Sequence, residues 1–524
     1  MQGTFIPAQT TLFTNAHIYQ HPGVDAILCA EGKIISVGKA ADFTADEVID
    51  LQGGYVYPGF TDSHMHLLGL GQALETLDLV GTNSAQEVVK KVQDKLPETQ
   101  PGEWITGRGW DQNDWLDTHF STKELLDGVA PQNPVYLRRI DGHAAWVNSR
   151  LLELAGIDSH TPDPPGGKIV RNEQGEPTGI LIDNAVDLIE KKLPPPKAKE
   201  RKRQILKAIH LLNSLGLTTI HDAGMALETI KTLKDLLAEG QLTVRIYAML
   251  SDTPQNTDPY LVSGPDTTNP YLIIRAVKLY LDGALGSRGA SLFQPYSDDP
   301  GNRGLILTDS AVVAQKVKNY NQAGFQVAIH CIGDRANRMA LDIYETNGLR
   351  SQRNRIEHAQ IIHPTDIPRF AALNVIPAMQ ATHCTSDMYW VDERLGPERL
   401  IEAYPWQSLI NSGAIIPNGS DAPVESPDPL AGLYAAITRQ DQKGWPPGGW
   451  RPEERLTITT AIQSFTEWPA YTSFEEKHKG KIAPRYYADF TVTNKDLLTV
   501  TPEKILSTDV TFTIVNGVVV YSNR

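Results

Sequence analysis

The sequence has few cysteines, no long apolar run and no excess of basic charge. Its three cysteines, Cys29, Cys331 and Cys384, cannot build a disulfide framework for 524 residues, which predicts a reducing, cytoplasmic location. No stretch approaches about 20 consecutive apolar residues, so we expect no membrane-spanning helix. The run from Met1 to Ala16 lacks a basic start and a continuous apolar core, which argues against a signal peptide.

The charge balance excludes two classes of partner. Lysine and arginine number 48 against 62 aspartates and glutamates, which gives a net charge of -14. Such a chain is repelled by nucleic acid and by anionic membranes, so the expected partner is a small-molecule substrate. The length suits a large barrel or two to three domains, and the choice between a monomer and a homodimer stays open.

Short strand-like runs separated by turn residues occupy both ends of the sequence. Residues 11–57 contain several of these runs, and the same pattern of short runs returns only after residue 487. Neither end is long enough to bury a good core alone. We therefore expect 1–57 and 480–524 to combine into one composite β-sandwich domain, with a barrel at 58–479 between them.

The middle of the chain alternates strand-like and helical patterns. Eight strand–helix units predict an α/β fold, a TIM-like (β/α)8 barrel. The segment at about 70–195 is too long for a loop and predicts an inserted subdomain after the first barrel strand. The connection at 251–273 is rich in Pro, Asp and Thr, which predicts an irregular segment. The expected strands are the run ending at His66, then 216–221, 244–250, 274–281, 325–330, 355–358, 374–379 and 414–421.

A His-x-His motif closes the first of these strands. Side chains alternate along a strand, so His64 and His66 point to the same side, roughly 6–7 Å apart along the backbone. Two neutral imidazoles on one face can chelate a borderline metal such as zinc. A single motif of this kind is also common without a metal, so the interpretation depends on further ligands.

Later strands supply further candidates: Lys278 lies inside an otherwise apolar strand, and His330, His358 and Asp421 each end a strand. The carboxyl ends of barrel strands open on one face, where catalytic residues gather. Taken singly, a strand-end histidine can be a satisfied core residue, and an aspartate can cap a helix. Lys278 can instead form an ion pair with a carboxylate such as Asp282. The residues expected to converge are His64, His66, Lys278, His330, His358 and Asp421.

Seven stretches together carry a resemblance to a known family. They are Pro58-Gly59-Phe60-Thr61-Asp62-Ser63-His64-Met65-His66, Val277-Lys278-Leu279-Tyr280-Leu281-Asp282-Gly283, His330-Cys331-Ile332-Gly333-Asp334-Arg335-Ala336, Arg355-Ile356-Glu357-His358, Gly419-Ser420-Asp421-Ala422-Pro423-Val424-Glu425, Gly107-Arg108-Gly109-Trp110-Asp111 and Asp141-Gly142-His143-Ala144. The set resembles the amidohydrolase superfamily, in particular its amidohydrolase family 3 branch. The resemblance implies a barrel with a composite β-sandwich and a metal-dependent hydrolase of non-peptide C–N bonds.

The resemblance also implies a ligand set. One ion would be held by His64, His66 and Asp421, and a second by His330 and His358. If this chain resembles the two-metal members of the family, a carboxylated Lys278 would bridge two zinc ions. Asp421 would then act as the catalytic acid and base.

Substrate contacts and the reaction itself are less constrained by the sequence. Candidate substrate-binding residues are Trp110, Asp111, His143, Arg288 and His383, each of which also has a purely structural interpretation. The same fold can support isomerase, ester-hydrolase or C–C hydrolase chemistry. A regulatory or binding protein that has lost catalysis is a third alternative, against which the intact ligand set argues.

Overall fold

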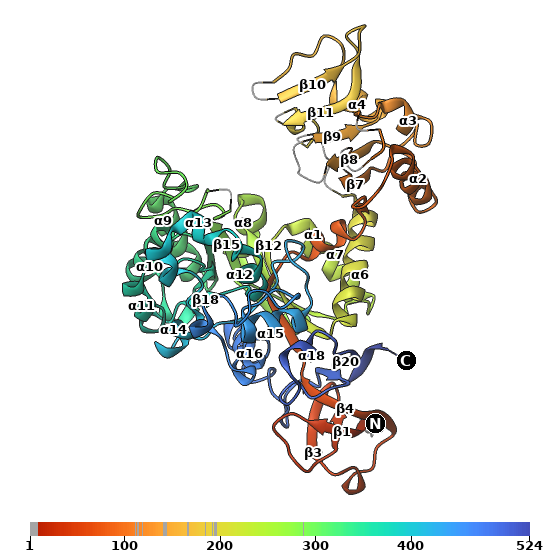
Figure 1. Cartoon of the computed structure of the whole chain (residues 1–524). Helices are drawn as coiled ribbons and strands as arrows, with labels where there is room; N and C mark the ends of the chain where they lie inside the picture. The colour runs from red at the N-terminus through yellow and green to blue at the C-terminus, as the bar shows by residue number, and fades with distance from the viewer. Residues whose placement is uncertain are drawn as a thin grey trace. The chain divides into compact units, whose positions relative to one another are not determined.

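A barrel of parallel strands carries the candidate residues and belongs to one of two compact units (Figure 1). The computed structural model describes residues 9–523 except 111, 113–114, 118, 140–143, 165–166, 184, 191, 193–195 and 287. One unit comprises residues 1–70 with 205–524, and the other comprises 71–204.

Seven strands form the barrel in the order in which they occur along the chain. Most are apolar and buried along their length, as parallel strands covered on both faces should be. In register, Tyr280 pairs with His330 and Cys331 with His358, so the carboxyl ends of these strands meet at one edge. The strands are β5 (Phe60–Met65), β12 (Leu217–Met225), β13 (Arg245–Ser251), β15 (Leu272–Tyr280), β16 (Gln326–Cys331), β17 (Arg355–His358) and β18 (Ile376–Ala378).

The expected eighth strand at 414–421 is not a regular strand, which corrects that prediction. Among the described residues it makes a single ladder bridge, between Met379 and Asn418. On its other side the Ser63 N–H donates to the Asn418 carbonyl oxygen at 3.0 Å. Pro417 has no N–H to donate, and Asp421 has a left-handed φ of 58°, so a regular ladder cannot continue. The segment still lies between β18 and β5 and leaves the barrel nearly closed.

Helices follow most barrel strands. Those predicted between strands include α6 (Ala198–Ser214), α7 (Leu227–Ala238), α9 (Ser310–Gln322) and α10 (Asp334–Asn347). The connection expected to be irregular contains α8 (Pro254–Ser263) and β14 (Asp266–Asn269), so that expectation was wrong. Pro at the first turn of α8 fits its start. The remaining helices of this unit are α1 (Leu67–Ala73), α11 (Ile367–Leu373), α12 (Ala381–Asp387), α13 (Val391–Leu395), α14 (Trp406–Asn411), α15 (Pro429–Thr438), α16 (Ile458–Ser464), α17 (Glu467–Thr472) and α18 (Pro502–Ile505).

The two ends of the chain pair in one seven-stranded sheet. Its order is β21-β20-β19-β4-β1-β2-β3, and Phe490 of β19 lies opposite Pro58 of β4. Phe13, Val56, Phe490 and Ile514 belong to its core. The termini therefore share a sheet, whereas the predicted sandwich stays a prediction. The strands are β1 (Thr10–Ile18), β2 (Ala26–Ala30), β3 (Lys33–Gly38), β4 (Glu47–Pro58), β19 (Phe490–Thr493), β20 (Val510–Val515) and β21 (Val518–Ser522).

The unit formed by 71–204 contains its own sheet, of order β10-β11-β9-β8-β7-β6. Its core includes Trp110, Trp115 and Trp146, whose rings pack at centroid distances of 6.0–6.5 Å. The strands are β6 (Leu77–Asp78), β7 (Ile105–Trp110), β8 (Val135–Arg139), β9 (Ala144–Val147), β10 (Gly167–Arg171) and β11 (Pro177–Asp183), and the helices are α2 (Ala85–Lys95), α3 (Lys123–Asp127), α4 (Ser149–Ala155) and α5 (Asp187–Glu190).

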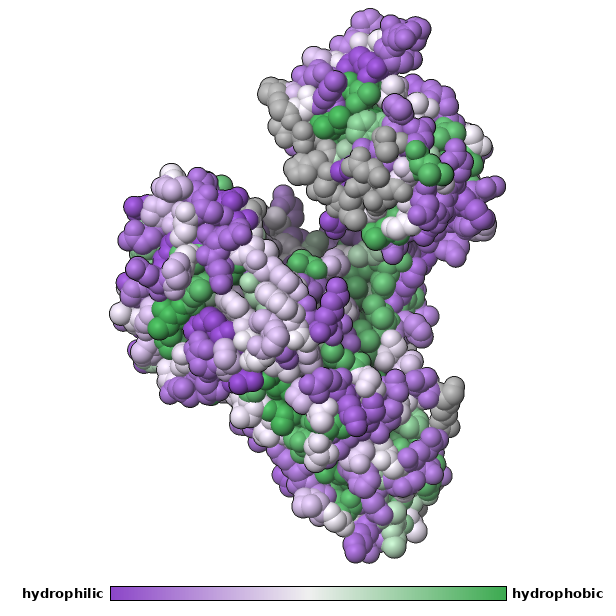
Figure 2. Space-filling model, in the orientation of Figure 1, coloured by the Kyte–Doolittle hydropathy of each residue, from purple (hydrophilic) through white to green (hydrophobic). Residues whose placement is uncertain are grey.

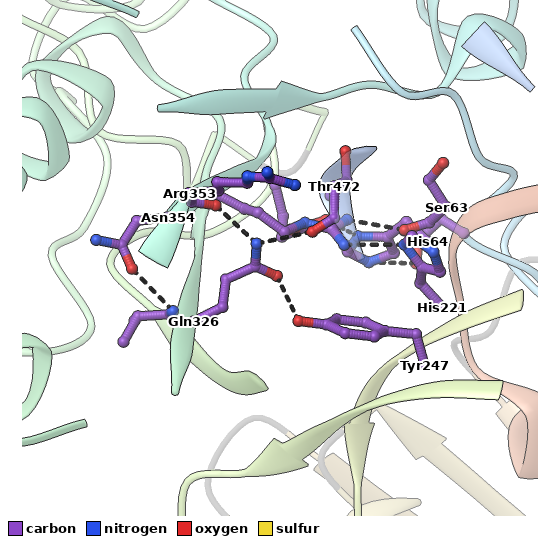
Figure 3. Close-up of polar contacts among 12 residues, drawn as sticks. Ser63, His64, His221, Tyr247, Gln326, Arg353, Asn354 and Thr472 are labelled. Carbon is purple, nitrogen blue, oxygen red and sulfur yellow. Dashed lines mark hydrogen bonds and ion pairs between the residues drawn. The ribbon is translucent and has the colours of Figure 1, made fainter. Parts of the chain in front are cut away.

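The barrel interior contains polar side chains that satisfy one another. The Gln326 amide donates to the carbonyl oxygens of Arg353 (2.7 Å) and Thr472 (3.1 Å) and accepts from the Tyr247 hydroxyl (3.0 Å). Figure 3 shows Gln326 between these partners, with Ser63, His64 and His221 at the other end of the group. Because buried polar groups are costly when unpaired, this network fixes how β16 sits against α17.

Hydrophilic residues cover most of the visible face of the barrel unit, and apolar residues lie between them in small groups (Figure 2). Within the described residues, no helix has the length and apolarity needed to cross a membrane. The three cysteines are free and buried, as expected from their number.

Candidate metal centre and active site

β5 brings His64 and His66 to Asp421, the residue that ends the irregular eighth segment. The Asp421 Oδ1 atom lies 3.4 Å from His64 Nε2 and 3.1 Å from His66 Nε2. The close approach depends on Gly419, where an added Cβ would lie 2.5 Å from the His64 backbone nitrogen. The Asp421 N–H donates to the His64 carbonyl oxygen at 2.6 Å. The predicted His-x-His pair and its carboxylate are therefore adjacent.

Asp62 fastens the same two segments together. Its carboxylate accepts from the backbone N–H groups of His64 (3.0 Å) and Ser420 (3.1 Å) and from the Ser420 hydroxyl (2.5 Å). Burial raises the pKa of Asp62 to about 6, although these hydrogen bonds oppose the shift. Asp62 thus positions the two ligand-bearing segments and does not itself face the candidate ligands.

Glu357 sets the orientation of His64. Its Oε2 atom accepts a hydrogen bond from His64 Nδ1, and Arg355 pairs with Glu357 at 2.6 Å, with all three side chains almost completely buried. Arg355 also lies 3.1 Å from His221 Nδ1 and donates to the Ser63 carbonyl oxygen at 2.8 Å. With the proton on Nδ1, the Nε2 lone pair of His64 faces Asp421. Such carboxylate–histidine pairs orient metal ligands in proteins.

A second group forms around His358 and also includes Asp421. One ligand atom from each of His358, His383 and Asp421 lies within 4.8 Å of the other two, and the same holds for His64, His66 and Asp421. His358 Nδ1 donates to Gln380 Oε1 at 2.9 Å, which leaves its Nε2 free. His330 belongs to neither group, although its ring centroid lies 4.5 Å from that of His358.

The pKa shifts of the histidines differ in direction. Burial lowers the pKa of His330 to about 3 and lowers those of His358 and His383, so these rings are neutral with free lone pairs at pH 7. Burial also opposes protonation of His64, but the charges of Glu357 and Asp421 outweigh it and raise the pKa of His64. Burial raises the pKa of Asp421, yet its contacts with His64 and His66 prevail and lower it well below the usual value. A site that attracts a proton in this way also attracts a metal cation.

Lys278 lies buried beside this cluster without the alternative partner considered from the sequence. Asp282 accepts instead from the backbone N–H groups of Ser291 (2.8 Å), Ile332 (2.9 Å) and Gly333 (2.8 Å). Among the described residues, no carboxylate lies within ion-pair distance of the Lys278 ammonium. Burial lowers the pKa of Lys278 to about 8, which increases the share of neutral amine near neutral pH.

The described substrate-binding candidates lie in different parts of the chain. Trp110 lies in the core of the 71–204 unit, where its indole N–H donates to the Leu137 carbonyl oxygen at 2.8 Å. Arg288 pairs with Asp298 at 2.8 Å in the loop after β15. His383 joins the ligand cluster, with its Nε2 atom 3.8 Å from Asp421 Oδ2. Asp111 and His143 lie outside the described residues.

A cavity of about 420 Å³ opens above the clustered side chains. Sequence reasoning missed several of its wall residues, notably Asp387, Trp390 and Glu425, because they lie in irregular loops or short helices. It also missed Glu357, although the Arg-x-Glu-His pattern at 355–358 places a carboxylate next to a predicted ligand. The lining residues are His64, His66, Lys278, Tyr280, Ala284, Leu285, Gly286, His330, Ile332, His358, Gln360, His383, Asp387, Trp390, Asp421, Val424 and Glu425.

The side chains fit a divalent metal. His64 Nε2, His330 Nε2, His383 Nε2 and Asp421 Oδ1 are buried and have no hydrogen-bond partner in the described part of the chain. Unpaired buried acceptors are costly. A cation bound among them removes that cost, and imidazole with carboxylate is a donor set that zinc accepts.

Comparison with known proteins supports this chemistry. A sequence model of the amidohydrolase family matches residues 47–521. The putative amidohydrolase YtcJ of Bacillus subtilis (strain 168) is 34% identical over 481 residues, which cover 91% of this chain and 90% of that protein. The N-substituted formamide deformylase of Arthrobacter pascens is 26% identical over 531 residues, or 95% of this chain and 94% of that protein.

A solved structure agrees with these sequence matches. An uncharacterized metal-dependent hydrolase from Pyrococcus furiosus superposes with a TM-score of 0.80 and 29% identity, covering 94% of this chain and 100% of that one. The match of the family model over most of the sequence, together with the barrel and its histidine–aspartate cluster, shows that this chain belongs to the amidohydrolase family.

Proposed function

We propose that the chain hydrolyses a non-peptide C–N bond, that of an amide, in a small molecule. The observation that carries the proposal is the group of buried histidine nitrogens and one aspartate oxygen, unpaired by hydrogen bonds, on the floor of a cavity. The Arthrobacter relative is named for acting on a substituted formamide, which is a bond of this class.

The proposed metal-binding residues come from the two groups that share Asp421 and from His330, whose ring centroid lies 4.5 Å from that of His358. His64, His66 and Asp421 would hold the first ion, and His330 and His358 would hold a second, with zinc as the proposed metal. His383 lies close enough to serve either as a further ligand or as a contact to the substrate. With two ions bound, Lys278 would serve as a further ligand once its neutral amine had added CO2 and released a proton, because the resulting carbamate supplies negative charge and oxygen atoms.

The reaction assigns a separate task to each group. When bound there, a divalent metal would lower the pKa of a water molecule toward 7 and polarise the substrate carbonyl. Asp421 takes a proton from the attacking water and delivers it to the leaving nitrogen as the C–N bond breaks. Glu357 keeps the proton on His64 Nδ1, so that His64 presents only its Nε2 lone pair to the centre.

The test is a substrate screen with purified protein loaded with zinc or stripped by a chelator. N-formyl, N-acyl and cyclic amides are assayed for amine release, each beside an ester of the same acyl group. We expect amide hydrolysis in the zinc-loaded protein only, with ester turnover marking the ester-hydrolase alternative. Protein that retains no zinc after loading, or that turns over nothing in the panel, would contradict the proposal and favour a binding role.

A further inference from the structure

Besides the histidines, two carboxylates and an aromatic ring line the cavity. Asp387 ends α12, one turn after His383, so that both residues lie on the same face of that helix. Glu425 lies four residues beyond Asp421, and Trp390 precedes α13. All three line the cavity above the candidate metal centre.

Each carboxylate is held in place by a single hydroxyl group. The Tyr404 hydroxyl donates to Asp387 Oδ2 at 2.5 Å, and the Ser386 hydroxyl donates to Glu425 Oε1 at 2.6 Å. Within the described ranges, neither carboxylate has a lysine, arginine or histidine within ion-pair distance. Each therefore keeps one oxygen for a ligand, and its position is fixed before the ligand arrives.

The two carboxylates are close enough to repel one another. Burial raises the pKa of Asp387 to about 7, and the charge of Glu425 adds to this shift. The neighbouring guanidinium of Arg394 is already engaged, because it lies over the Trp390 ring at 5.5 Å from the centroid, pairs with Asp298 and donates to the Gly286 carbonyl oxygen at 3.2 Å. Lys278 is the only lysine or arginine that lines the described cavity, and it lies beside the metal ligands.

We propose that this wall selects amides carrying a positive charge away from the scissile bond, such as a mono-N-acylated diamine. The cation lies between Asp387 and Glu425, whose carboxylates attract it, and Trp390 forms an adjacent part of the cavity wall. An anionic substrate is repelled at the same place. The inference rests on the proposed amide hydrolysis and specifies its substrate class.

Three matched compounds test the proposal on the zinc-loaded full chain. They are the mono-N-formyl derivative of a four-carbon diamine, its neutral analogue with a methyl group in place of the ammonium, and its analogue with a carboxylate there. We expect kcat/KM to be highest for the cation, lower for the neutral analogue and lowest for the anion. The value for the cation should exceed that for the neutral analogue by about tenfold. Added salt should lower the cation-to-neutral ratio of kcat/KM, because salt screens part of the attraction between the substrate cation and the two carboxylates.

Two variants at Glu425 assign the effect to the wall. Glu425→Gln should reduce the cation-to-neutral ratio of kcat/KM about tenfold, and Glu425→Lys should favour the anion instead. Glu398→Gln removes the same charge from an exposed residue outside the cavity and should leave the ratio unchanged, which controls for the net charge of the chain.

The outcomes separate this inference from the proposed function. Hydrolysis of the neutral amide with no preference for the cation overturns the inference and leaves the proposed function intact. If none of the three is hydrolysed, the proposed function fails for this class, and calorimetric titration of the same compounds decides the inference. Equal dissociation constants for the cation and its neutral analogue would then refute it.

Discussion

Replacing Glu357 with glutamine should damage both stability and metal binding. Glu357 and Arg355 are fully buried and paired at 2.6 Å, and Glu357 also accepts from His64 Nδ1. Burial alone would raise the pKa of Glu357, but the charges of Arg355 and His64 prevail and lower it to about 2. Glutamine keeps the shape and the acceptor oxygen but leaves the Arg355 charge without a counter-ion.

The size of the effect follows from burial. Breaking a buried ion pair by removing one partner costs about 3–5 kcal/mol, because the other charge stays buried. Weaker orientation of a ligating histidine typically lowers metal affinity by about 10–100-fold. Glu476 offers a matched control, since it pairs with Arg353 at 2.8 Å with its side chain 33% exposed. Glu476→Gln should cost only about 0–1 kcal/mol.

Urea unfolding of both variants without metal gives the stability, and competition with a metal-binding dye gives the affinity. Glu357 has a lowered pKa in the folded state, so its contribution is present above the unfolded value near 4.3 and is lost as the pH falls toward about 2. The stability gap between the parent and Glu357→Gln should therefore close over that range. If Glu357→Gln is no less stable than Glu476→Gln and binds metal normally, the assigned role is wrong.

Three further predictions concern the centre and one concerns the terminal sheet. Asp421→Asn should keep the fold but lower turnover by about 10²–10⁴ at equal metal content, and near-normal turnover would exclude it as the acid and base. Lys278→Ala should lose metal and activity and regain part of both with short-chain carboxylates, whereas a free amine at Lys278 in fully metallated protein would exclude the carbamate. Metal affinity should weaken as the pH falls through the raised pKa of His64, because a proton then occupies the ligand; chelator competition across pH measures this, and a flat profile would contradict it. Deleting 480–524 removes β19, the partner of β4, and should give insoluble protein, while a soluble, active truncation would show that the ends fold independently.

The sequence predicts which side chains on the barrel strands lie together at one end of the barrel. His64 and His66 could be placed together because alternation along a strand is rigid, and their convergence with Asp421 follows from barrel topology. His330 and His358 could be placed at neighbouring strand ends for the same reason. Periodicity says nothing about distances between ring nitrogens, however. The structure consequently puts His383, from α12, into the second group of candidate ligands while His330 lies outside it.

Residues on irregular segments could not be placed from the sequence. Asp387 and Glu425 become neighbours across the cavity only through the course of the loops around α12 and after Asp421. The role of Glu357 depends on a contact with His64, which lies 293 residues away in the sequence. Contacts of this kind depend on side-chain packing in the assembled barrel, for which a local pattern carries no signal.

The failure of the predicted eighth strand lies where the chemistry is concentrated. A regular strand at 414–421 would hold Asp421 with negative φ, whereas its φ is 58° and its Oδ1 atom reaches both His64 and His66. His358, which belongs to the second group, has a φ of 73°. Such conformations cost about 1–3 kcal/mol each and persist only where the surroundings enforce them. The hydrogen bond from the Ser420 hydroxyl to Asp62 and the absence of a side chain at Gly419 provide that enforcement. The irregular segment therefore places one carboxylate within reach of both groups of candidate ligands.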